Sequence, residues 1–228
     1  MPFTPDTFRF LEALVSHNDR AWFEANKATY EAHCREPALA FVRAMAPRLE
    51  RVAPRFVADD RKVGGSLMRV HRDTRFSHDK SPYKTNIGIQ FRHEGGDDVH
   101  APGIYLHIEA GPCFLGLGSW MPEAAVLASI RNGIVDHPHR FHAAIRPLSP
   151  PWDREGRHGG VDALKRAPKG FDPDHPLVAE LKKKSHLATR PLTRDELTSP
   201  DLDGIVAGYL AEAAPFLRWL TEAAGAPF

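Results

Sequence analysis

The sequence predicts an α+β fold in which an antiparallel, meander-like central sheet is flanked by N-terminal and C-terminal helices. Before residue 53 and after residue 122, apolar residues recur with the 3.6-residue period of an α-helix. Between residues 85 and 120 the period falls to two, which is typical of strands. The strand candidates are joined by short connections, which favours antiparallel pairing because parallel strands need long crossovers. The 228 residues contain no internal repeat or linker, so we expect one domain over residues 1–228.

Three helices are expected in the N-terminal part of the chain. The first begins at Pro5 behind a Thr4 cap, because proline is tolerated at the first helical position. A second cap signal at residues 16–19 predicts the next helix, and Pro37 is predicted to open a third that ends before Pro54. Their apolar and aromatic stripes consist of Phe8, Leu11, Leu14, Val15, Trp22, Phe23, Tyr30, Val42, Met45, Leu49 and Val52.

Four segments in the middle of the chain have the pattern of strands: residues 66–72, 85–91, 103–109 and 113–120. The alternation is clearest in residues 103–109, where every second residue is a branched aliphatic one. Because successive side chains of a strand point to opposite faces, this strand has two distinct sides. One side is predicted to carry Ile104, Leu106 and Ile108, and the other Tyr105, His107 and Glu109.

Helices are expected again in the C-terminal half, at residues 122–134, 136–145, 177–185 and 202–220. The last of them follows a cap signal at residues 199–201, and Pro215 inside it predicts a kink. Two segments rich in turn-forming residues are predicted to lack regular structure. Residues 94–98 are expected to form a turn and residues 147–160 a loop.

Composition is that of an ordinary globular protein. Hydrophobic residues make up 42% and charged residues 26%, which excludes wholesale disorder. Lys plus Arg number 30 and Asp plus Glu 29, so the formal net charge is +1, which excludes a globally basic nucleic-acid binder but allows a local basic patch. Cys34 and Cys113 are predicted to be buried free thiols. With no signal-peptide pattern and no apolar run of about 20 residues, we expect a cytoplasmic protein without membrane contact.

Positive charge is densest in residues 69–84, which hold five Lys or Arg and two Asp. A turn between two strand-like ends would bring these cations together on one loop. Arg offers a planar fork that fits phosphate or carboxylate, and Lys offers a mobile point charge. A second basic cluster lies on a loop at residues 164–171. The candidate anion-binding residues are Arg72, Arg75, Lys80, Lys84, Lys165 and Lys169.

The polar side of the 103–109 strand supplies the candidate proton-transfer group. His107 beside a carboxylate can act as a general acid or base, with Glu109 or Asp73 to orient it. Gly116 and Gly118 in the next strand would leave space above the sheet for a ligand. Nucleotide-binding, serine-hydrolase and zinc-protease motifs are absent, so we predict no metal site and leave the cofactor open. The pocket is expected to include Tyr83, Tyr105 and Trp120.

Several longer motifs run through the chain. Residues 18–30 read Asn-x-Arg-x-Trp-Phe-x-x-Asn-Lys-x-x-Tyr, and residues 72–84 read Arg-Asp-Thr-Arg-Phe-Ser-x-Asp-Lys-x-Pro-Tyr-Lys. Further motifs lie at residues 102–109, 120–122 and 164–176. Together they resemble the family called domain of unknown function 2461, over about residues 3–220. This resemblance implies membership of that family and supplies neither a substrate nor catalytic residues.

Three functions are compatible with these residues. We favour a small enzyme whose basic pocket binds an anionic substrate, such as a phosphorylated one. The first alternative is a non-enzymatic module that binds nucleic acid or an acidic protein through the same basic surface, against which the near-neutral total charge argues. The second alternative is structural, with the charges pairing among themselves to hold loops to the sheet. The sequence leaves the reaction, the substrate and the oligomeric state open.

Overall fold

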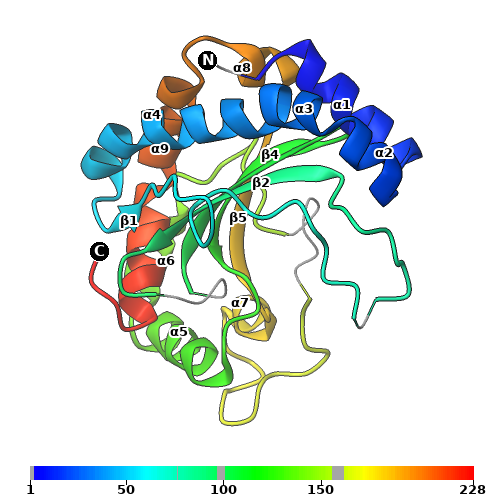
Figure 1. Ribbon diagram of the computed structural model, residues 1–228. Coiled ribbons are helices and arrows are strands. Elements are labelled where there is room, and N and C mark those ends of the chain that lie inside the picture. The colour runs from blue at the N-terminus through cyan, green and yellow to red at the C-terminus, as the bar shows by residue number, and fades with distance from the viewer. Residues whose placement is uncertain (1–2, 76, 97–100, 156–161) are drawn as a thin grey trace.

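Five antiparallel strands form one sheet in the order β1-β2-β3-β4-β5, so neighbours in the sheet are also consecutive strands along the chain (Figure 1). The computed structural model describes residues 3–75, 77–96, 101–155 and 162–228. The predicted α+β class with a meander-like antiparallel sheet is confirmed. The strands are β1 (Phe56–Val57), β2 (Asn86–His93), β3 (Gly103–Glu109), β4 (Cys113–Ser119) and β5 (His186–Leu192).

Two long helices, α4 (Glu36–Val52) and α9 (Leu202–Ala223), pack against each other and cover one face of the sheet (Figure 1). The strands turn their aliphatic side chains toward these helices, which removes them from water and stabilises the fold by about 1.5–3 kcal/mol per fully buried side chain. The strand residues buried there are Ile87, Ile89, Phe91, Ile104, Leu106, Ile108, Leu115 and Leu117. In the described part of the chain, no helix covers the middle of the opposite face of the sheet.

The N-terminal helices are α1 (Pro5–Ser16), α2 (Arg20–Ala25) and α3 (Lys27–Tyr30), and α3 continues through a π-helical segment, η1 (Glu31–Arg35), into α4. Pro37 lies in the first turn of α4, close to the predicted start of the third helix, but α4 follows η1 without a break. Pro37 has no N–H to pair with a carbonyl of the preceding turn. The hydroxyl of Thr7 in α1 donates to the carbonyl of His33 at 2.6 Å, and this bond satisfies one carbonyl of that turn. Val15, placed in the apolar stripe of α1, is exposed.

The remaining helices lie close to their predicted positions: α5 (Ala124–Asp136), α6 (Pro138–Ile145) and α7 (Val178–Lys182). Residues 94–96 form a turn and residues 147–155 a loop, as predicted, while residues 97–98 and 156–160 of those two predictions lie outside the described residues. Cys34 and Cys113 are buried free thiols, as predicted.

Sequence reasoning missed α8 (Arg194–Thr198) and the outer strands, and it placed a strand at residues 66–72 that the structure does not form. That segment meets β2 only locally, through the bridge between Leu67 and Ile89. β1 consists of two residues, too few to show a period. In β5, Pro191 interrupts the β-forming pattern that predicts a strand.

A buried histidine lies at the start of β5. His186 is 1% exposed, and neither of its ring nitrogens has a hydrogen-bond partner among the described residues. Arg154 and Lys183 lie nearby and both bind Glu180, at 2.9 Å and 3.2 Å. Burial, reinforced by Lys183, Arg154 and Arg131, lowers the pKa of His186 to about 3. The ring is therefore neutral in the folded protein across the neutral and mildly acidic range.

His186 makes the protein sensitive to acid. The pKa of this imidazole is near its ordinary value of 6.5 in the unfolded chain and near 3 in the folded chain. The neutral ring therefore contributes fully to the unfolding free energy above about pH 6.5, and this contribution is lost as the pH falls toward 3. When the pH is lowered from about 7 to 4.5, the unfolding free energy of the wild type should fall by about 2–3 kcal/mol more than that of His186→Leu. Urea unfolding at both pH values measures this difference. Equal losses in the two proteins would contradict it.

Candidate functional site

The open face of the sheet carries a row of side chains that crosses four strands. In the antiparallel register Gln90 of β2 lies opposite Tyr105 of β3, and Tyr105 lies opposite Gly116 of β4. Gly116 in turn lies opposite Thr189 of β5. Because directly opposite residues of a sheet point to the same face, these positions together form the floor of a site.

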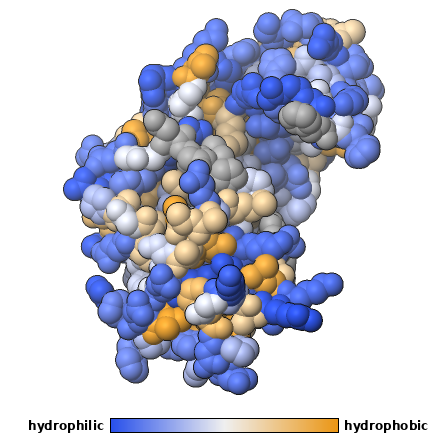
Figure 2. Space-filling model, turned by 90° about the horizontal axis from the view of Figure 1, so that it is seen from below, coloured by the Kyte–Doolittle hydropathy of each residue, from blue (hydrophilic) through white to orange (hydrophobic). Residues whose placement is uncertain are grey.

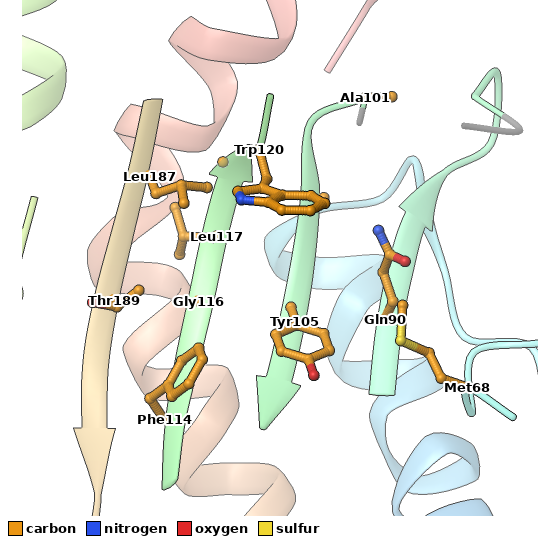
Figure 3. A pocket seen from close by; sticks show the side chains of 12 residues that line it. Met68, Gln90, Ala101, Tyr105, Phe114, Gly116, Leu117, Trp120, Leu187 and Thr189 are labelled. Atoms are coloured by element: carbon orange, nitrogen blue, oxygen red, sulfur yellow. The ribbon is translucent and has the colours of Figure 1, made fainter. Parts of the chain in front are cut away.

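A pocket of about 370 Å³ lies over this row (Figure 3). This is within the size range of small-molecule sites. Its floor is hollow because Gly103, Gly116 and Gly118 contribute no side chains. Figure 3 shows the lining side chains in front of the sheet, with the helices behind it. The large side chains around the pocket are Met68, Tyr105, Phe114, Trp120 and Leu187.

Two of these glycines play different roles. A Cβ atom on Gly116 would come no closer than 3.6 Å to its neighbours, Phe114 and Thr189, so this position has room for a side chain. Gly118 has a φ of +127°, and a Cβ there would lie 2.1 Å from the carbonyl oxygen of His186. Gly118 is therefore required by the backbone, whereas Gly116 keeps the pocket open.

A polar array begins at the pocket and runs along β3. The Tyr105 hydroxyl lies 3.1 Å from Nδ1 of His107, and Nε2 of His107 lies 3.2 Å from a carboxylate oxygen of Glu109. Asn86, which sequence reasoning missed, donates from Nδ2 to the Tyr105 hydroxyl at 3.3 Å. The His107 ring stacks on Phe114 with 4.8 Å between the ring centres. Only the register between β2 and β3 brings Asn86 into this array.

These partners assign the proton positions. Nε2 of a neutral His107 donates to Glu109, so Nδ1 is the acceptor and takes the hydrogen bond from the Tyr105 hydroxyl. Burial raises the pKa of Tyr105 to about 12; the Asn86 hydrogen bond opposes this shift and the Glu109 charge adds to it. The phenol is therefore neutral near pH 7 and acts as a donor.

In the basic loop, which is the cation-rich segment at residues 69–84, both aspartates pair with arginines of the same segment. Arg72 forms an ion pair with Asp79 and donates to the Ser81 hydroxyl at 2.6 Å. Arg75 holds Asp73 with two hydrogen bonds, at 3.0 Å and 2.7 Å. This guanidinium keeps the pKa of Asp73 well below its usual range.

The other predicted anion-binding residues also lie away from the pocket lining. Lys80 donates to the backbone carbonyl of Thr74 at 2.9 Å. Lys84 is half-buried, and burial lowers its pKa. Lys165 and Lys169 are exposed on the loop before α7. No Lys or Arg is among the described residues that line the pocket, and it is Glu109, not Asp73, that contacts His107.

Tyr83 lies in the core and not in the pocket, contrary to expectation. It is 3% exposed and stacks on Phe23 of α2 with 4.0 Å between ring centres. Asn18 clamps its backbone, accepting from the Tyr83 N–H at 3.1 Å and donating to its carbonyl at 3.0 Å. Of the three predicted pocket residues, Tyr105 and Trp120 line the pocket, and Trp120 is 47% exposed. The tyrosine stack with α2 depends on contacts between distant residues that no local pattern reveals.

The surface around these elements is uneven in polarity. Figure 2 shows one side of the molecule, where apolar side chains gather in the middle and hydrophilic side chains surround them.

Among the described residues, no three His, Cys, Asp or Glu side chains are grouped as metal ligands. None of the helices in the described part of the chain has both the length and the apolar character needed to cross a bilayer.

Comparison with known families matches residues 6–219 to the conserved hypothetical proteins designated DUF2461. The chain belongs to the DUF2461 family. This match confirms the resemblance carried by the motifs. No curated protein and no solved structure matches the chain significantly. In this DUF2461 protein at least part of the early motif is structural, because Asn18 and Phe23 both hold Tyr83.

The two glycines provide a stability test of the pocket floor. Gly116→Ala should change the unfolding free energy by less than about 0.5 kcal/mol, since the added methyl group has room. Gly118→Ala should cost about 3 kcal/mol, because a methyl group there overlaps the backbone of β5. Thermal unfolding should show this as a melting temperature lower by about 10 °C for Gly118→Ala. Similar melting temperatures for both variants would contradict the assignment.

Proposed function

We propose that this DUF2461 protein is a small enzyme that binds its substrate on the open face of the sheet and moves a proton through Tyr105. One observation carries the proposal. The Tyr105 side chain lines the pocket, and its hydroxyl contacts His107, which in turn contacts Glu109. A pocket joined to a hydrogen-bonded chain of this kind supports general acid–base catalysis.

The array favours removal of a proton from the substrate. As the substrate's X–H bond breaks, its proton passes to the Tyr105 oxygen, and the hydroxyl proton passes to Nδ1 of His107. The electron pair of the broken bond stays on the substrate, which becomes an anion. The imidazolium that forms is paired with Glu109, only 3.2 Å from Nε2. The reverse sequence protonates a basic substrate atom. In this scheme Tyr105 touches the substrate, His107 accepts the hydroxyl proton of Tyr105, and Glu109 stabilises the imidazolium that forms.

The pocket walls suit an uncharged part of the substrate. An anionic group on the same substrate would have to meet cations on the surrounding loops, since the described lining residues include none. Arg72 and Arg75 already hold Asp79 and Asp73. For those two residues, the internal ion pairs support the structural alternative more than a nucleic-acid interface.

Turnover by variants of the array tests the proposal. Wild-type protein is incubated with pooled small metabolites, and products are followed by mass spectrometry. Tyr105→Phe and His107→Gln should each slow any conversion about 100-fold or more, because positioned acid–base groups contribute about that much. Gly116→Leu, which fills the pocket, should abolish conversion, and Gly116→Ala serves as the control for the backbone change.

Three results would overturn the proposal. They are wild-type rates in Tyr105→Phe and His107→Gln, unchanged turnover in Gly116→Leu, and no conversion of any compound that binds the wild-type pocket. The last result would point to a binding protein without proton-transfer chemistry. Thermal melting of each variant establishes that a lost rate does not reflect lost folding.

A further inference from the structure

The shape of the pocket favours a flat ligand. Gly116 and Gly103 leave an open strip of sheet, and Tyr105 and Phe114 border this strip (Figure 3). The Trp120 indole reaches from the end of β4 across toward β3. Aromatic side chains around a flat floor favour a planar ring, because offset or edge-to-face ring contacts add about 0.5–1.5 kcal/mol beyond burial alone.

The chemistry of the described lining residues favours an uncharged ring. The described residues that line the pocket include no Asp, Glu, Lys or Arg. Their side-chain polar groups are the Gln90 amide, the Tyr105 hydroxyl, the Thr189 hydroxyl and the Trp120 indole N–H. The Thr189 hydroxyl already donates to the carbonyl of Asp153 at 3.4 Å. A buried charge without a partner would be costly there, so an uncharged ring fits this site.

Gln90 gives the pocket a hydrogen-bonding edge. Gln90 is 8% exposed, and its side chain extends in Figure 3 from β2 toward the end of the sheet where Trp120 lies. A carboxamide presents a donor and an acceptor side by side, and it pairs in two-point fashion with a ring edge that carries an acceptor beside a donor. The amide also recognises such an edge more selectively than it recognises a hydrocarbon.

We infer that the pocket binds a flat, uncharged heteroaromatic ring that presents a hydrogen-bond donor next to an acceptor, stacked near Trp120 and paired with the Gln90 amide. The inference rests on the proposed function, because it describes the substrate of the same pocket. The ring edge would face Gln90, and the substrate atom that exchanges a proton would face Tyr105, which lies opposite Gln90 in the register.

Three probes of similar size separate the contributions of flatness and hydrogen bonding. Isoquinolin-1(2H)-one is flat and has a lactam edge, naphthalene is flat without a polar edge, and octahydroisoquinolin-1-one keeps the lactam but is not flat. Calorimetry or ligand-observed NMR gives the affinity of each for the wild-type chain. Isoquinolinone should bind about tenfold more tightly than either other probe, as one net hydrogen bond or ring stack would provide.

Two variants assign the contributions to residues. Gln90→Leu removes the amide at similar size, and it should weaken isoquinolinone about tenfold while leaving naphthalene unchanged. Trp120→Leu should weaken both flat probes and leave the saturated lactam unchanged. Unchanged naphthalene affinity in Gln90→Leu also shows that the pocket is still folded. Gly116→Leu, which fills the floor, should abolish binding of all three probes.

Each contrary result overturns the inference. If naphthalene binds as tightly as isoquinolinone, or if Gln90→Leu keeps full isoquinolinone affinity, then Gln90 does not recognise the ligand by hydrogen bonds. Equal affinity for the saturated lactam would show that the pocket does not require a flat ring. If none of the probes binds, the proposed ligand class is wrong. The turnover test depends on Tyr105 and His107 and uses pooled metabolites, so the ligand class can fail while the proposed proton transfer stands.

Discussion

The alternation of side chains in the central strands is the constraint on which the rest of this structure depends. In β3, Ile104 and Ile108 must point to the side that α4 and α9 cover, and their burial helps to hold the helices on the sheet. The same period of two sends Tyr105 and His107 to the opposite side. Covering one face and equipping the other with polar groups are therefore two consequences of a single geometric rule.

The open face combines the pocket with the polar array, and Tyr105 belongs to both. Glycine on β4 makes the hollow, and the register places it beside Tyr105. In the neighbouring row His107 stacks on Phe114 and reaches Glu109. Phe114 both lines the pocket and fixes the imidazole ring. The proposed chemistry thus needs two adjacent rows of the sheet, one that holds the ligand and one that takes the proton.

Charge in this protein serves structure more than the sequence suggests. Arg75 and Asp73 are two positions apart and satisfy each other within the loop. A second charged group lies near the start of β5, where Lys183 and Arg154 both pair with Glu180 beside the neutral His186. Glu180, Lys183 and His186 are close in sequence, but only the fold brings Arg154 to Glu180.

The sequence alone determined the α+β class, the three central strands and the side of β3 on which Tyr105 and His107 lie. Periodicity and cap signals are local properties, so they can be read without the fold. Tertiary structure decided that β5 lies beside β4, that Asn86 joins the polar array, and that Tyr83 packs in the core while Trp120 borders the pocket. These outcomes depend on register and on contacts between segments distant along the chain, which no local spacing encodes.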